Sequence, residues 1–143
     1  LVKTAVNTLG ENIQLGQWTQ VEASVVSGYV HSNRKIAVLI GLEGGTQDLA
    51  RDTAMHAAAM NPRVKYPEEV SADLIGKEKE IWTEQLKQEG KPVDKIPMIM
   101  MGKEKKFREE NALVSQPFVK DNSKTVGQFL GTARITHYVR MLV

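Results

Sequence analysis

The residues of this 143-residue chain best suited to acid–base or metal chemistry are its three histidines, because the sequence contains no cysteine. His31, His56 and His137 fall in three separate predicted elements, with no H-x-H or H-x-x-x-H spacing among them. Zinc needs three or four converging ligands, so we expect neither a metal site nor a cofactor. His56 shares a helical stripe with Leu49 and Met60, and we interpret it as a packed, hydrogen-bonded core residue.

Two short patterns could in principle bind phosphate or activate a nucleophile. Gly41, Gly44 and Gly45 lie between a predicted strand and a helix N-terminus, where phosphate is often bound, but no Lys-Ser or Lys-Thr pair follows them as in a P-loop. Ser32 and Lys35 fit the S-x-x-K pattern, but no K-T-G element accompanies them. We interpret the glycines as a structural turn and the second pattern as the tip of a hairpin. An enzyme is therefore not expected.

The charges give little indication of nucleic acid. Lys and Arg number 19 against 17 Asp and Glu, and the two signs are interleaved. The most basic-looking segment, 103–110, contains three opposite-charge pairs at i, i+4, which is typical of a solvated helix face. RNA binding through this helix is a minor alternative, with steep salt dependence as its signature. The longest apolar run, 36–42, is far shorter than the roughly 20 residues of a membrane span, so we expect no membrane.

The hydrophobic pattern predicts an α+β fold in which a small antiparallel sheet packs against helices. In the first half we expect a helix over 1–9, a strand over 12–22, a β-hairpin over 24–44 with its tip at 31–35, and a helix over 47–60. The strand at 36–40 is continuously apolar, so we place it in the centre of the sheet with both faces covered.

The last third of the chain returns to strands. A strand is expected near 112–121, and a short helix over 123–130 capped by Asp121, Asn122 or Ser123. A final strand over 134–143 follows, with Ile135, His137, Val139 and Met141 expected on one side.

The middle of the chain predicts a helical hairpin. Ser71 caps a helix that runs to Glu89, and Gly90 has the place of a left-handed residue after it. A second helix runs to about Asn111, with a kink at Pro97 or a start near residue 96. We therefore divide the chain into a core of residues 1–70 and 112–143 and an inserted hairpin of residues 71–111. The apolar residues that could make the hairpin a self-association or docking arm are Leu74, Ile81, Trp82, Ile96 and Phe107.

Several stretches together resemble one family, bacterial elongation factor Ts, whose members help elongation factor Tu to exchange its bound nucleotide. The matching stretches are, in order, LGENI, GYVHSNRKIAVLIGLEGG, LARDTAMHAAAMNP, PEEVSADLIGKEKEI, QEGKP, GKEKKFREENALVSQPFVKDNSKTVGQFL and ITHYVRMLV. They extend from about residue 9 to the end of the chain, and their order and spacing make the resemblance strong.

The resemblance implies that the chain corresponds to the second of two related α/β subdomains, with the helical hairpin inserted in it as a projecting arm. It also implies that the family's N-terminal helical domain and C-terminal module are lacking, so we expect a processed or shortened chain. The family's Thr-Asp-Phe-Val segment, which acts near the nucleotide site of the GTPase, is lacking too, because LEGGTQDLA stands at the corresponding position. Pro97 departs from the family's arm, which leaves the local geometry there to be determined.

The residues that match the family's contact turn are Tyr29, His31, Asn33 and Arg34, which the resemblance implies would meet the third domain of elongation factor Tu. We therefore expect a non-enzymatic, cytoplasmic translation-factor fragment that binds elongation factor Tu weakly and accelerates nucleotide release little. The alternative is a structural module that forms a homodimer through the helical hairpin.

Overall fold

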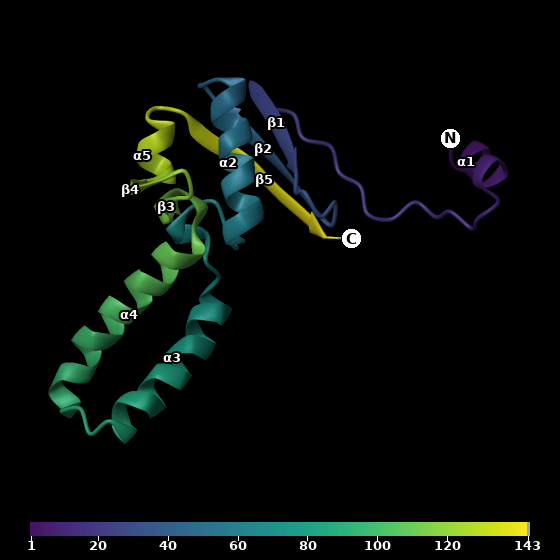
Figure 1. Cartoon of the computed structure of the whole chain (residues 1–143). Coiled ribbons are helices and arrows are strands. Elements are labelled where there is room, and N and C mark those ends of the chain that lie inside the picture. The colour runs from purple at the N-terminus through teal and green to yellow at the C-terminus, as the bar shows by residue number, and fades with distance from the viewer. Residues whose placement is uncertain (143) are drawn as a thin grey trace.

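The computed structural model describes residues 1–142 as a mixed α+β body from which a helical arm projects (Figure 1). The elements are α1 (Val2–Leu9), β1 (Val25–Val30), β2 (Ile36–Glu43), α2 (Gln47–Met60), α3 (Ala72–Gln88), α4 (Ile96–Asn111), β3 (Pro117–Phe118), β4 (Asp121–Thr125), α5 (Val126–Leu130) and β5 (Arg134–Leu142), with 3-10 turns at Pro67–Glu69, Val93–Lys95 and Leu113–Ser115. The expected α+β class with a small antiparallel sheet is therefore confirmed.

The main sheet has three antiparallel strands in the order β1-β2-β5, so β2 is central as predicted. In the middle of the sheet, Val38 of β2 lies opposite Tyr29 on β1 and Arg140 on β5. Directly paired residues share a face of a sheet, and Val38 is only 1% exposed. Tyr29 and Arg140 therefore emerge on the same, covered face, on either side of Val38.

Helix α2 supplies that cover. The Thr46 side chain caps it by accepting from the Leu49 N–H, and Asn61 ends it in a left-handed conformation. Small side chains on its inner face let the helix backbone approach the sheet closely. The buried residues that this contact brings together include Ala50, Ala54, Ala57 and Ala58 of α2 and Val38, Ile40 and Leu42 of β2.

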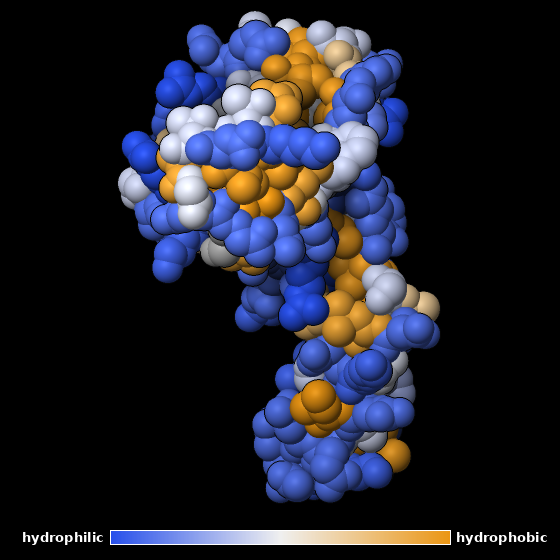
Figure 2. Space-filling model, turned by 90° about the vertical axis from the view of Figure 1, so that its right-hand side faces the viewer, coloured by the Kyte–Doolittle hydropathy of each residue, from blue (hydrophilic) through white to orange (hydrophobic). Residues whose placement is uncertain are grey.

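The opposite face of the sheet is not covered in the same way, which corrects our expectation that β2 is shielded on both faces. Ala37 is exposed and Leu39 is half-buried, and the two line a shallow hollow of about 220 Å³ together with Val139, Trp18 and neighbouring side chains. Figure 2, which views the molecule from the side of α1, shows hydrophobic residues gathered on the body and in smaller patches along the arm. A continuous apolar run thus indicated a central strand correctly, but it did not show how many faces are packed.

Strand β5 forms as predicted over Arg134–Leu142, while residue 143 lies outside the described residues, but its side chains do not alternate throughout. The register shifts beside Gly41, which faces His137, whereas the next residue of β2 faces Ile135. Thr136 is therefore an extra residue in a β-bulge. Ile135 is 2% exposed whereas His137 is exposed, so the two do not share a side as we expected.

Residues 12–22 do not form the predicted strand. Helix α1 ends at Gly10, in a left-handed conformation with φ 68°, and the chain is then irregular as far as residue 24. Leu15 and Trp18 are 72% and 73% exposed. A strand needs a neighbour to satisfy its backbone N–H and C=O groups, and no strand among residues 1–142 pairs with this segment. The alternation of apolar and polar residues was therefore not enough to predict a strand over residues 12–22.

The arm consists of two antiparallel helices, as expected (Figure 1). The Ser71 side chain caps α3, and Gly90 has a φ of 66° in the turn between the helices. Helix α4 begins at Ile96, so Pro97 lies in its first turn, where a missing N–H removes no helical hydrogen bond. Of the two alternatives for Pro97, the late helix start is confirmed.

The segment that follows the arm differs from expectation. The predicted strand near 112–121 is reduced to the two residues of β3, and residues 121–125 form β4 instead of opening a helix. The Asp121 carboxylate accepts from the Ser123 hydroxyl at 2.6 Å and so closes a turn. Helix α5 is capped by Thr125, in a capping box with Gln128.

His56 is a buried, hydrogen-bonded core residue, as predicted. Its Nδ1 accepts from the Val119 N–H at 3.1 Å, so Nε2 carries the proton and donates to Gln116 Oε1 at 2.9 Å. Gln116 in turn donates to the Glu110 carbonyl at 2.9 Å. Burial lowers the pKa of His56 from its usual value. The chain of bonds joins α2 to the last turn of α4, where the arm meets the body.

Candidate functional site

The four residues predicted to contact a partner lie at the end of β1 and in the tip between β1 and β2. The His31 N–H donates to the Ile36 carbonyl at 2.9 Å, and the Arg34 N–H donates to the His31 carbonyl at 2.8 Å. Asn33 Oδ1 accepts from the Lys35 N–H at 2.9 Å, and the Arg34 backbone has a left-handed conformation with φ 56°. The tip is therefore fixed by its own hydrogen bonds, while the Asn33 and Arg34 side chains are exposed.

Tyr29 and His31 lie side by side at the base of this tip, and both are half-buried. The phenol oxygen is 3.4 Å from His31 Nδ1, which is long for a hydrogen bond, and the ring centroids are 6.0 Å apart. Residues two apart in an extended chain point to the same side, and here that side is the one on which α2 packs. The structure thus brings these two predicted residues together.

A pocket of about 450 Å³ adjoins Tyr29. Its other walls come from α2 and from Lys120, which lies between β3 and β4. Lys120 Nζ is 2.7 Å from Asp52 Oδ1, so the pocket wall carries an ion pair beside an aromatic ring. Of its lining residues, Tyr29, Arg51 and Met55 are of types enriched at protein interfaces, whereas Asp and Lys are depleted there.

The α2 residues of this pocket, Asp48, Arg51, Asp52 and Met55, were missed by sequence reasoning. Helical periodicity could have indicated them, because residues 48, 52 and 55 recur on one face of the predicted helix. Lys120 could not have been found in that way. It lies 68 residues from Asp52 in the sequence, and only the tertiary fold brings the two together.

The predicted arm residues divide into inward and outward positions. Trp82 is 9% exposed and packs edge-on against Phe107, with ring centroids 5.7 Å apart, so both fill the contact between α3 and α4. Leu74 and Ile96 are half-buried, and Ile81 is 51% exposed. The large apolar side chains exposed on the arm are Ile81, Val93, Met98 and Met101. The arm and the β1–β2 tip are separate surfaces (Figure 1).

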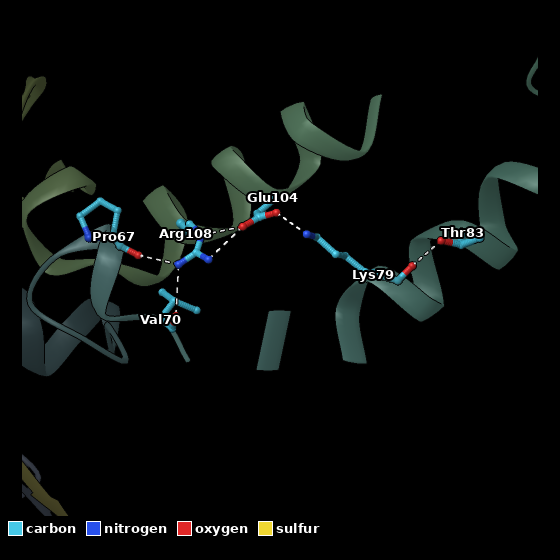
Figure 3. Close-up of polar contacts among 6 residues, drawn as sticks. All are labelled: Pro67, Val70, Lys79, Thr83, Glu104 and Arg108. Atoms are coloured by element: carbon cyan, nitrogen blue, oxygen red, sulfur yellow. Dashed lines mark hydrogen bonds and ion pairs between the residues drawn. The ribbon is translucent and has the colours of Figure 1, made fainter. Parts of the chain in front are cut away.

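The root of the arm is held by an ionic network (Figure 3). Arg108 donates to Glu104 Oε1 from two nitrogens, at 3.0 and 2.9 Å, and to the carbonyls of Pro67 and Val70 at 3.3 and 3.1 Å. Lys79 of α3 lies 2.6 Å from Glu104 Oε2. The hydrogen bond from Lys79, and then that from Arg108, lower the pKa of Glu104. The network connects both arm helices to the turn that precedes α3.

Among residues 1–142, the structure has no helix long and apolar enough to cross a membrane, and no group of three His, Asp or Glu residues that could hold a metal ion. Both ring nitrogens of His56 form hydrogen bonds within the fold. The β1–β2 tip and the arm carry the residues that the sequence predicted to contact a partner.

Comparison with known proteins identifies the family. The family described as Elongation factor TS matches residues 1–143. The chain is 48% identical over 128 residues to elongation factor Ts of Marinobacter nauticus, which covers 90% of this chain and 44% of that protein. It is 45% identical over 140 residues to that of Cellvibrio japonicus (96% and 48% covered), and 44% identical over 140 residues to that of Deinococcus deserti (98% and 53% covered). The chain spans about half the length of these curated relatives. The resemblance read from the sequence is therefore confirmed, and the chain belongs to the elongation factor Ts family.

Proposed function

We propose that this chain binds elongation factor Tu through the β1–β2 tip and the adjoining pocket, as the part of a cytoplasmic, non-enzymatic translation factor that promotes exchange of GDP for GTP. The observation that carries the proposal is the Tyr29–His31 pair, held half-buried at the base of a self-bonded tip and next to a pocket of mixed charge. A rigid aromatic and polar patch of this kind is typical of the residues that dominate protein interfaces. Membership of the family supplies the class of partner.

The expected effect on nucleotide release is small. An exchange factor changes nucleotide affinity only to the extent that it binds two states of the GTPase differently. The family's Thr-Asp-Phe-Val segment would act on the nucleotide site, but residues 42–50 here, which run from the end of β2 into the first turn of α2, contain no aromatic side chain. We therefore expect this chain to bind elongation factor Tu without greatly accelerating the release of GDP.

The test is a calorimetric titration of the chain into GDP-bound elongation factor Tu, with His31→Ala as the variant. We expect saturable binding that His31→Ala weakens about tenfold, the usual effect of truncating an important interface residue. His137→Ala is the matched control, because His137 is an exposed histidine on β5, beside Gly41 and away from the tip. No binding, or equal weakening by both variants, would contradict the proposed surface. Release of fluorescent GDP, measured with the same samples, tests the second expectation, and rapid release would overturn it.

A second candidate function is self-association through the arm. Four exposed apolar side chains on α3, α4 and the turn between them favour it: Ile81, Val93, Met98 and Met101. Trp82 and Phe107 would contribute only by holding the two helices together, since they pack on each other. Sedimentation equilibrium without a partner protein separates the two candidates. A concentration-dependent dimer that Ile81→Glu abolishes would favour this one, and a monomer at all concentrations would exclude it.

A further inference from the structure

A second pocket, of about 450 Å³, lies at the C-terminal end of α2 and is lined by Asn61, Pro62, Arg63, Tyr138 and Arg140. Two of these five residues carry a positive charge and none carries a negative one. The pocket is distinct from the one beside Tyr29, because the two sets of lining residues do not overlap. Its unbalanced charge requires an explanation.

Arg140 contributes to this pocket a hydrogen-bond donor that no protein group satisfies within residues 1–142. Its Nε is buried and has no hydrogen-bond partner within residues 1–142, and it is the one buried side-chain nitrogen or oxygen there of which this is true. Strand pairing places Arg140 opposite Val38, so its side chain emerges beneath α2 and not on the open face. Buried donors in folded proteins are nearly always paired. The Nε–H of Arg140 therefore calls for an acceptor.

No neighbouring group within residues 1–142 accepts from that Nε–H. The Tyr138 hydroxyl donates to the Pro62 carbonyl at 2.9 Å, so these two groups bond to each other, and neither is bonded to Arg140 Nε. Burial raises the pKa of Tyr138 to about 12, and the phenol accordingly stays neutral. The C-terminus of α2 contributes a partial negative charge of roughly one half. That is too little to balance two guanidinium groups.

Arg108 is an example, in the same molecule, of an arginine whose guanidinium group is hydrogen-bonded by the protein. It donates to one carboxylate and to two backbone carbonyls. In contrast, neither Arg63 nor Arg140 forms an ion pair or a side-chain hydrogen bond with the rest of residues 1–142. Guanidinium groups present planar pairs of donors that match the oxygens of a carboxylate or a phosphate.

We propose that this pocket binds an oxyanion, a carboxylate or phosphate group held between Arg63 and Arg140. Arg140 forms the floor through its buried Nε–H, and the exposed Arg63 closes over the ligand from the loop after α2. The bound group fills the acceptor position that the protein leaves empty. This site does not depend on contact with elongation factor Tu through the β1–β2 tip.

The test follows the arginine Nε–Hε signals of the ¹⁵N-labelled chain by NMR. Inorganic phosphate and a blocked Glu-Glu dipeptide are titrated separately at constant ionic strength, with chloride as the reference. We expect the Arg140 signal to shift in a saturable way with at least one probe. A response to phosphate alone indicates a free or esterified phosphate as the ligand, and a response to the dipeptide alone indicates a protein carboxylate.

Arg63→Gln should weaken this binding about tenfold, as the loss of one charge-assisted hydrogen bond does. Arg134→Gln is the matched control, since Arg134 is exposed on the same strand and outside the pocket. Arg140→Lys keeps the charge but removes Nε, so it should fold and still lose binding. Shifts that grow linearly with both probes, or equal responses in Arg63→Gln and Arg134→Gln, would overturn the proposal.

Discussion

Replacing Arg108 with glutamine should loosen the root of the arm while leaving its helices intact. The guanidinium group donates to the carbonyls of Pro67 and Val70, and the glutamine side chain is too short to reach both. Each lost hydrogen bond is worth about 1 kcal/mol in net stability. Glu104 keeps its contact with Lys79 at 2.6 Å, so no buried carboxylate is left without a partner. We therefore expect a loss of about 2 kcal/mol at the arm root.

Hydrogen exchange measures this loss where it occurs. The Val70 N–H is bonded to the Pro67 carbonyl, and the Glu69 N–H to the Tyr66 carbonyl, within the turn that Arg108 holds. If these amides exchange by opening of that turn, a change of about 2 kcal/mol corresponds to exchange about thirtyfold faster. Amides in the middle of β2 should be unaffected, because that strand lies in the core of the body.

Lys105→Gln is the control for a charge removed from the same helix. Its partner Glu109 is 3.9 Å away and the Lys105 side chain is 78% exposed, so the change should cost less than about 0.5 kcal/mol. Unchanged exchange at residues 69 and 70 in Arg108→Gln would refute the reasoning. Equal effects of the two substitutions would show that net charge, and not the carbonyl contacts, governs the arm root.

Three further predictions concern the body. Because burial lowers the pKa of His56 from 6.5, this histidine binds a proton more readily in the unfolded chain than in the folded one. The free energy of unfolding should therefore fall as the pH drops below about 6.5 toward the lower folded-state pKa. In urea titrations, His56→Gln should lack this contribution to the pH dependence. Arg34→Gly should raise the free energy of unfolding by about 0.5–1 kcal/mol, because glycine adopts the left-handed conformation found there, with φ 56°, without strain. No gain in melting temperature would contradict that explanation. Ala54→Leu should cost about 1–3 kcal/mol by overpacking the contact between α2 and the sheet. The same change at the exposed Ala59 should cost less than about 0.5 kcal/mol in the same urea assay.

The parts of the fold that could be predicted are those specified by local chemistry. Ser71 and Gly90 marked helix boundaries correctly, because caps and left-handed residues act within a few positions of the chain. The strand expected over 12–22 failed because its existence depends on a partner strand, which periodicity cannot supply. The bulge at Thr136 could not be predicted from the sequence either, because it arises from the pairing of two segments about 95 residues apart.

The candidate site was predictable only in part, for the same reason. Tyr29 and His31 were named from a local stretch, and their mutual contact follows from their spacing in an extended chain. The pocket beside them requires α2 to cross the sheet at a particular angle and Lys120 to approach Asp52. The Arg63–Arg140 pocket likewise joins the loop after α2 to the last strand. No spacing rule relates residues so far apart.

The helix at 103–110 shows how a correct local interpretation can still miss a role. All three predicted pairs at i, i+4 are present, at 2.9, 3.9 and 3.7 Å, and two of them are exposed as a solvated face should be. The third pair, Glu104 with Arg108, has side chains only 24% and 27% exposed and also contacts Lys79 and the turn before α3. Sequence spacing treats the three pairs alike, because each satisfies the same helical geometry. They differ in what the fold places beside them. Only the Glu104–Arg108 pair lies against α3 and the turn before it, and its contacts there join the arm to the body.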